Sequence, residues 1–353
     1  MKHCNQILIL AALGMVFLTS CEKDPVGQGE PEPITFEEGI FISCEGAFGQ
    51  GNASVRFIHP QGLVNGDIYS QVNSEDLGDV LQSLSFIDEK AYLVVNGDKK
   101  IVVVDQSSFE KQTEITGFNS PRYLVESDGL GYVTNYYTDY IHVVDLGTNA
   151  IVDSIDLGKG SDLAMKSGNT FWTISPKEWM GSDVNHIYSV NLTDSTVDSL
   201  EVGWNPSTWA CDEGSDMLYV YCQGKEIDNG DEGAQIVSID LISGEVVNTH
   251  DLGYTNKTSV VSYDSFRDRV LFSQEDGIYS FDVNTATVSS NPLIPITDID
   301  YIYSIAAFPA SGEIFVGDAN DFSSAGDIFQ FDTDGQLIGQ AQIGIAPNGF
   351  YFE

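Results

Sequence analysis

The sequence repeats a unit of four short apolar segments separated by turn residues, and this unit is clearest over residues 121–158. The residue that opens this unit, Arg122, has counterparts in other units. The opening positions are Gln82, Arg122, Asp162, Ser207, Lys257, Tyr303 and Asn348. They lie 40, 40, 45, 50, 46 and 45 residues apart, which is the period of a four-stranded propeller blade rather than of a helical solenoid.

The two ends of the chain complete this pattern. In six units the third segment ends in an aspartate or asparagine, at Asp105, Asp145, Asn191, Asp240, Asp282 and Asp332. The first unit has only three segments, Gly39–Cys44, Ser54–His59 and Leu63–Tyr69, and we expect its missing inner strand to come from Pro347–Phe352. The sequence therefore predicts an all-β, seven-bladed β-propeller over residues 39–353, closed by the C-terminal strand, which leaves no open radial edge.

The charge of the chain narrows its possible partners. Acidic residues number 53 and basic residues 15, which gives a formal net charge of −38. Neutralising phosphates requires clustered lysine and arginine, so this balance argues against binding of nucleic acid or of an anionic membrane surface. A solvated, self-repelling surface explains most of the acidic residues.

The N-terminus has the features of a targeting segment. Met1–Lys2 is followed by an apolar run over Ile7–Phe17 and then by Leu18-Thr19-Ser20-Cys21. This order resembles a bacterial lipoprotein signal peptide over residues 1–20, with lipidation at Cys21; an ordinary cleaved secretory signal is the alternative. Residues 21–38 then form the lipid anchor and a flexible tether. The sequence after Cys21 resembles the export signal of surface lipoproteins, so we expect an outer-membrane, lipid-anchored protein exposed at the cell surface, with a periplasm-facing protein as the alternative.

The opening positions of the blades are the first candidates for ligand binding. In a propeller they lie around the central opening, on the same face as the loops between second and third strands, and they share no common residue type here. Arg122 and Lys257 could bind an anionic group. An internal ion pair between Arg122 and Asp162 is the competing interpretation. Further candidates on this face are Asn96, Asn135, Tyr136, Tyr137, Trp179, Trp204, Asp318 and Asn320.

Aromatic residues at loop positions also favour this face as the binding face. Trp179 and Trp204 fall in predicted loops, with Phe48 and Phe322 on other blades, whereas Trp172 and Trp209 fall in strands and should be core residues. Exposed aromatics indicate a flat, partly apolar ligand or a protein partner. Packing within the loops is the alternative.

Catalytic and metal-binding signals are weak. The five histidines are scattered, and neither a nucleophile elbow nor a phosphate-binding loop occurs. The acidic loops 228–232 and 318–327 could hold calcium, but neither has the spacing of a complete calcium loop. Outside the leader and anchor, Cys44, Cys211 and Cys222 do not form a regular disulfide framework. We therefore predict no catalytic residues, metal or cofactor.

Several stretches resemble one family over essentially the whole mature chain. They are residues 39–51, 77–83, 93–96, 117–123, 312–318 and 344–350. They are similar to surface-lipoprotein propellers of the YncE-like, DUF5074 type, which include cobalamin-capturing lipoproteins of the BtuG type. The resemblance implies capture of a corrinoid (vitamin B12) and its transfer to a TonB-dependent outer-membrane transporter.

Three functional hypotheses follow. The first is a non-enzymatic capture protein for a small molecule on the loop face. The second is a structural or adhesive surface propeller that binds a protein or glycan. The third is a lactonase-like hydrolase, which would need an acid, base or metal cluster in the central opening, where the opening positions supply one acidic residue, Asp162.

Overall fold

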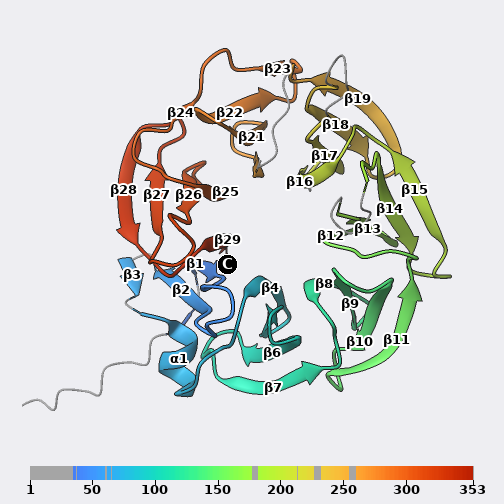
Figure 1. Cartoon of the computed structure of the whole chain (residues 1–353), viewed down its shortest axis with the longest axis vertical. Coiled ribbons are helices and arrows are strands. Elements are labelled where there is room, and N and C mark those ends of the chain that lie inside the picture. The colour runs from blue at the N-terminus through green and yellow to red at the C-terminus, as the bar shows by residue number, and fades with distance from the viewer. Residues whose placement is uncertain are drawn as a thin grey trace, which may run out of the picture. The chain divides into compact units, whose positions relative to one another are not determined.

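The computed structural model describes residues 35–36, 38–59, 62–64, 66–176, 182–212, 214–225, 232–253 and 260–352. The compact unit begins at Thr35. Within it, the strands form seven antiparallel sheets arranged as the blades of a ring (Figure 1). No helix in the described part of the chain has the length and apolar character needed to span a membrane.

Each blade is named by its place along the chain, and its strands run from the centre outwards. Blade 1 is β29 (Pro347–Phe352), β1 (Ile40–Cys44), β2 (Ser54–His59) and β3 (Gly62–Val64). Blade 2 is β4 (Leu81–Ile87), β5 (Lys90–Val95), β6 (Lys100–Asp105) and β7 (Lys111–Thr116). Blade 3 is β8 (Pro121–Ser127), β9 (Leu130–Asn135), β10 (Tyr140–Asp145) and β11 (Ala150–Asp156).

The remaining blades follow the same order. Blade 4 is β12 (Ala164–Ser167), β13 (Thr170–Ile174), β14 (His186–Asn191) and β15 (Val197–Glu201). Blade 5 is β16 (Pro206–Asp212), β17 (Met217–Cys222), β18 (Gln235–Asp240) and β19 (Glu245–Asp251). Blade 6 is β20 (Val261–Asp264), β21 (Arg269–Gln274), β22 (Gly277–Asp282) and β23 (Thr287–Val288), with β24 (Ile294–Pro295) also paired to β22. Blade 7 is β25 (Ile302–Ala307), β26 (Ile314–Asp318), β27 (Asp327–Phe331) and β28 (Leu337–Gln342).

The predicted closure of the ring is confirmed. β29 pairs antiparallel with β1, and the register places Phe41 opposite Tyr351. Figure 1 shows β29 beside β1 at the inner end of the first blade. The Tyr351 hydroxyl also accepts a hydrogen bond of 3.0 Å from the Leu84 amide on β4. The C-terminal strand is therefore joined both to the blade it completes and to the next blade.

The recurring polar residue at the end of the third strand has a local physical cause. The Asp105 carboxylate accepts hydrogen bonds from the amides of Ser107 and Ser108, which close the turn into β7. Asp240 makes the same pair of bonds with the amides of Ile242 and Ser243. An Asx turn of this kind replaces the backbone pairing lost at the strand end, and these bonds lower the pKa of both carboxyls.

The core is divided among the blade interfaces. In the described part of the chain, seven buried clusters each join two neighbouring blades, including the pair formed by blades 7 and 1. The first cluster stacks Phe41 on Phe109 at 5.6 Å and packs Phe36 edge-on against Phe57 at 5.4 Å. Trp172 lies in the cluster between blades 4 and 5, and Trp209 packs against it, as predicted.

The third segment of the first unit was predicted incorrectly. A strand was expected over Leu63–Tyr69, but β3 is confined to Gly62–Val64 and a short helix, α1 (Ile68–Asn73), follows. Asp67 caps this helix, because its carboxylate accepts hydrogen bonds from the amides of Tyr69 and Ser70. The helix buries both Ile68 and Tyr69 in the first core cluster. In a strand, these two successive side chains would point to opposite faces of the sheet.

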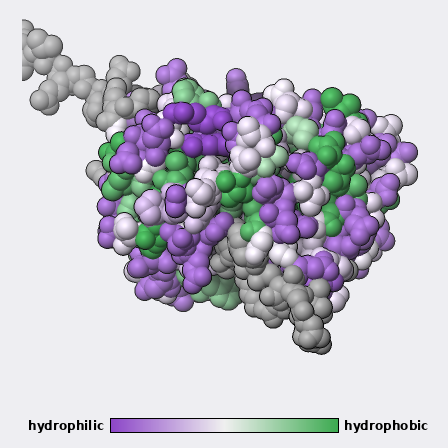
Figure 2. All heavy atoms as spheres, turned by 90° about the horizontal axis from the view of Figure 1, so that it is seen from above, coloured by the Kyte–Doolittle hydropathy of each residue, from purple (hydrophilic) through white to green (hydrophobic). Residues whose placement is uncertain are grey.

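The visible face of the molecule is mainly polar, in agreement with the charge of the chain. Figure 2, at right angles to Figure 1, shows hydrophilic residues in the majority and hydrophobic residues in smaller separate patches. Among the described residues, Cys44, Cys211 and Cys222 form no disulfide, and the register pairs Cys211 with Leu218 rather than with Cys222.

Candidate functional site

The opening positions of the blades come together around one central cavity. This cavity has a volume of about 460 Å³. It lies on the face that carries the segments leading into the inner strands and the loops between second and third strands, which we call the loop face. The opposite face, with the remaining turns, is the turn face. The opening positions that line the cavity are Gln82, Arg122, Asp162, Ser207, Tyr303 and Asn348; Lys257 lies outside the described residues.

Irregular pairing explains why these side chains reach the cavity. On β4, Leu81 and Ser83 pair with consecutive residues of β5, so Gln82 is an extra residue without a partner in the ladder. Similar register shifts occur around Ser207, Tyr303 and Asn348, and one on β8 spans Arg122. A β-bulge bends its strand and re-aims a side chain. The fold therefore has such a register shift at the mouth of five blades, with a different polar residue at each.

Arg122 is held by internal partners. Its Nε donates to Asp162 Oδ1 at 2.8 Å and its Nη2 to Asp162 Oδ2 at 3.3 Å, while Nη1 donates to Gln82 Oε1. The guanidinium also lies over the Tyr136 ring, 5.2 Å from its centroid. The internal ion pair, one of the two interpretations of Arg122, is the arrangement that the structure contains. Its charge is therefore already balanced within the protein.

Glu45 is the residue at this site that the sequence analysis missed. It follows β1 directly and lines the central cavity beside Arg122 and Tyr303. Its Oε1 accepts a hydrogen bond of 3.2 Å from Asn348 Nδ2, and its carboxyl is also bonded to the Tyr303 hydroxyl. Burial raises the pKa of Glu45, and these hydrogen bonds and the Arg122 charge oppose the rise only in part. Its position immediately after β1, the strand with which the C-terminal strand pairs, was the one signal in the sequence, and it did not separate Glu45 from the other acidic residues.

A second, wider pocket adjoins the central cavity on the loop face. It has a volume of about 780 Å³, and the loop that joins β1 to β2 forms part of its lining. Four residues line both cavities, and we call them the polar collar: Glu45, Gln82, Arg122 and Tyr303. A molecule that enters the central cavity from the wider pocket passes this collar.

Aromatic side chains line part of the wider pocket and lie elsewhere on the loop face. Phe48 lines it with 87% of its surface exposed, and Phe322 lines it from blade 7. Phe322 also packs edge-on against Tyr301 and Tyr303, with ring centroids 5.0 Å apart in both pairs. Tyr137 is 60% exposed on blade 3. These rings offer apolar contact area beside the polar collar.

The other predicted site residues have different positions. Asn96 lines the wider pocket and donates to the Pro121 carbonyl at 2.9 Å. Asn135 is buried, with its Nδ2 2.8 Å from His142 Nδ1. Trp204 is half-buried, and Lys225 Nζ lies over its ring at 3.2 Å from the centroid. Trp179 lies outside the described residues, as does Cys21.

The loop at residues 318–327 is held by its own acidic residues. Asp318 is buried and accepts hydrogen bonds from the amides of Asp300, Tyr301 and Asn320. Asn320 in turn donates to the Ala325 carbonyl at 2.9 Å. Asp318 and Asn320 therefore shape the loop and do not line the collar. In the parts of the chain that are described, no group of three or more His, Cys, Asp or Glu side chains is placed to hold a metal ion.

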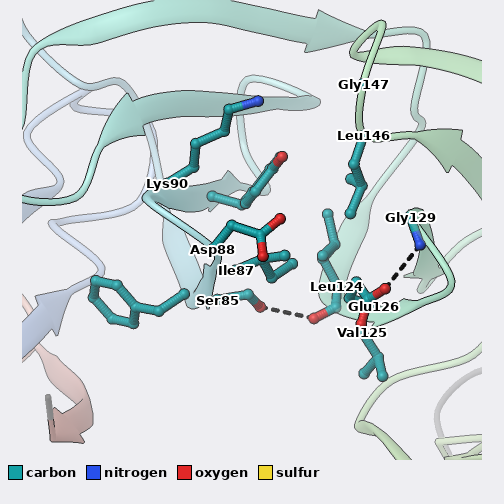
Figure 3. Close-up of a pocket in the computed structure, with 12 residues that line it drawn as sticks. Ser85, Ile87, Asp88, Lys90, Leu124, Val125, Glu126, Gly129, Leu146 and Gly147 are labelled. Atoms are coloured by element: carbon teal, nitrogen blue, oxygen red, sulfur yellow. Dashed lines mark hydrogen bonds between the residues drawn. The ribbon is translucent and has the colours of Figure 1, made fainter.

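A groove on the turn face is a separate feature. It lies between blades 2 and 3 and has a volume of about 800 Å³ (Figure 3). Asp88, Lys90 and Glu126 are among the residues that line it. The Glu126 carboxylate accepts a hydrogen bond of 2.9 Å from the Gly129 amide. Comparable pockets on this face lie between blades 4 and 5 and between blades 7 and 1. We attribute these grooves to the repeated blade geometry.

The fold and its site define a seven-bladed β-propeller with a polar central cavity on the loop face. The chain belongs to the DUF5074 family, described as a domain of unknown function, which matches residues 38–290. No curated protein matches the chain.

Solved structures share the fold at low sequence identity. A quinonprotein alcohol dehydrogenase-like protein from Bacteroides thetaiotaomicron matches with a TM-score of 0.68 and 14% identity, over 90% of this chain and 79% of that chain. The Kuenenia stuttgartiensis hydrazine synthase matches with a TM-score of 0.60 and 14% identity, over 73% of this chain and 85% of that chain. Dihydro-heme d1 dehydrogenase NirN matches with a TM-score of 0.56 and 13% identity, over 92% of this chain and 76% of that chain. Identities this low carry the fold and no activity.

Proposed function

We propose that the protein is a non-enzymatic, lipid-anchored capture protein that binds a small molecule on its loop face. The observation that carries this proposal is the convergence of bulged opening positions on one cavity, with aromatic side chains above it. A concave site with a few polar groups and apolar surroundings is the usual form of a small-molecule site. The lipid anchor at Cys21 and exposure at the cell surface are parts of the same proposal.

A corrinoid is our first candidate for the ligand. The family resemblance supports it, together with the size of the site, because the central cavity and the wider pocket adjoin at the collar. The corrin macrocycle is flat and suits aromatic contact, and its amide groups suit the polar side chains of the collar. We further propose transfer of the corrinoid to a TonB-dependent outer-membrane transporter.

Binding of a protein or glycan partner is the second candidate. Phe48 and Tyr137 favour it, since both rings are more than half exposed on the loop face. Exposed aromatic residues are common anchors of protein interfaces. A lactonase-like hydrolase is a weaker candidate, because Asp162 is paired with Arg122 and Glu45 is bonded to Tyr303 and Asn348.

Calorimetric titration of residues 36–353 with cyanocobalamin tests the first candidate. We expect one-to-one binding that Phe48→Ala weakens about tenfold or more, since burying a phenylalanine contributes about 1.5–3 kcal/mol. Phe266→Ala is the matched control, because Phe266 is 52% exposed in the turn that joins β20 to β21 on the turn face. The absence of heat and of a thermal shift, or equal effects of the two variants, would contradict corrinoid capture on the loop face.

A further inference from the structure

The polar collar has little positive charge to offer a ligand. Arg122 is its only cation among the described lining residues, and both of its contacts with Asp162 fall within 3.3 Å. Gln82 takes a third guanidinium bond, and the Tyr136 ring lies against the guanidinium face. An incoming anion would have to compete with a carboxylate that is already in place.

The collar has hydrogen-bond acceptor positions that its internal hydrogen bonds do not use. Glu45 of the collar and Asp162, which lines the central cavity beside it, place two carboxyls near the one guanidinium of Arg122. A carboxylate offers about four acceptor positions, whereas Glu45 has bonds from Asn348 and Tyr303. Because Arg122 is paired with Asp162, Glu45 has no cation of its own within salt-bridge distance among the described residues. The raised pKa of Glu45 agrees with a carboxyl buried under these conditions.

Among the described residues, the surroundings of the collar add no positive charge that would balance its excess of acceptor groups. The wider pocket is lined by aromatic rings and by neutral polar residues such as Gln50, Asn52 and Asn96. The chain as a whole carries a formal net charge of −38, which repels anions approaching from solution. A carboxylate or phosphate placed at Glu45 would therefore meet a like charge in a partly desolvated site, which is the arrangement that specific sites use to exclude a ligand.

We propose that Glu45 makes the collar selective for a hydrogen-bond-donating group of the ligand, such as a primary amide, and excludes a carboxylate or phosphate at the same place. This inference rests on the proposed function, because it assumes that the loop face binds a small molecule. Under this inference Arg122 acts as a positioning residue that holds Asp162 and Gln82, and not as the anion-binding group that was the other interpretation of it.

Small probes that differ in one functional group test this selectivity without any assumption about corrinoids. The dissociation constants of propionamide and propionate are measured by ligand-observed NMR on the purified full chain, on Glu45→Gln and on Glu126→Gln. Glu126→Gln is the matched control, because it removes the same charge beside the groove on the turn face.

We expect the full chain to bind propionamide at least tenfold more tightly than propionate. Glu45→Gln should bring the two dissociation constants within about threefold, chiefly through a gain in propionate binding, and Glu126→Gln should leave the preference intact. A gain of binding requires a folded variant, so misfolding cannot produce the expected result. Equal binding of the two probes by the full chain, no binding of propionamide, or an unchanged preference in Glu45→Gln would overturn the inference. Failure of cyanocobalamin to bind would instead remove the corrinoid proposal alone.

Discussion

The pairing of Arg122 with Asp162 makes a quantitative prediction about stability. Both side chains are 22% exposed, and the shortest distance between them, from Nε to Oδ1, is 2.8 Å. A pair near a protein surface gains ~4 kcal/mol of Coulomb energy at a charge separation of about 4 Å. Desolvation and side-chain ordering offset more than half of this Coulomb energy. Measured contributions set two limits: exposed ion pairs contribute about 0.2–1 kcal/mol, and loss of one partner of a buried pair costs about 3–5 kcal/mol.

The predicted coupling therefore lies between these limits. In a double-mutant cycle of Arg122→Met and Asp162→Asn, we expect the double variant to be less destabilised than the sum of the single variants by about 1–2 kcal/mol. The free energy of unfolding is measured by urea denaturation, with the variants compared at equal slope. The cycle removes the contribution of the Gln82 bond, since that bond is lost in both variants that lack Arg122.

A control cycle uses an ion pair that is open to solvent. Arg267 and Asp334 lie 3.3 Å apart with 44% and 77% of their side chains exposed, and their coupling should be under about 0.5 kcal/mol. If the Arg122–Asp162 coupling is equally small, the pair does not stabilise the ring. The Arg122 guanidinium would then be more easily released to an anionic ligand, which is the other interpretation of this residue.

Three further predictions concern single positions. Glu45→Gln should raise the melting temperature at pH 7 and change it little near pH 4: a carboxyl whose pKa is raised by folding contributes most stability below its unfolded pKa of about 4.3 and loses it as the pH rises through the folded value. An equal effect at both pH values would contradict this. Asp264 is fully buried and bonded to Arg269 Nε at 2.7 Å, so Asp264→Asn should lower the free energy of unfolding by about 3–5 kcal/mol; a loss below about 1 kcal/mol in urea denaturation would refute it. Tyr351→Phe deprives the Leu84 amide of its acceptor and should cost about 1–3 kcal/mol in the same assay; an unchanged free energy of unfolding would contradict this.

The ring and its closure were predictable because they depend on periodic features. The predicted bounds Ser54–His59 and Pro347–Phe352 coincide with β2 and β29. The Asx turns at Asp105 and Asp240 mark strand ends in the sequence itself. The helix α1 was not predictable in the same way, because six residues give no clear helical period and only the cap at Asp67 signals its start.

The central cavity was predictable in position but not in chemistry. The seven opening positions were identified by their phase, and six of them line the cavity as described. Their side-chain partners depend on neighbouring blades that are about 40 residues apart in sequence, as with Arg122 and Asp162. Glu45 could not be separated from the other acidic residues, since its role depends on Asn348 at the opposite end of the chain.

The burial of Asn135 and Asp318 has the same cause. Each stands at a strand end on the loop face, where sequence phase alone suggests exposure. In the structure, adjacent loops cover them and use their hydrogen bonds, as the amides of Asp300 and Tyr301 do with Asp318. Loop conformation decides such cases, and it has no periodic signal in the sequence.

Amide hydrogen exchange of residues 36–353, with and without cyanocobalamin, tests the central claim most directly because it locates the ligand on one face. We predict slower exchange in the loops at residues 45–53 and 319–326 on the loop face, with no change in the turns at residues 88–89 and 128–129 beside the groove of Figure 3. Protection confined to those turns, or no protection under conditions that saturate binding, would contradict a ligand site at the polar collar.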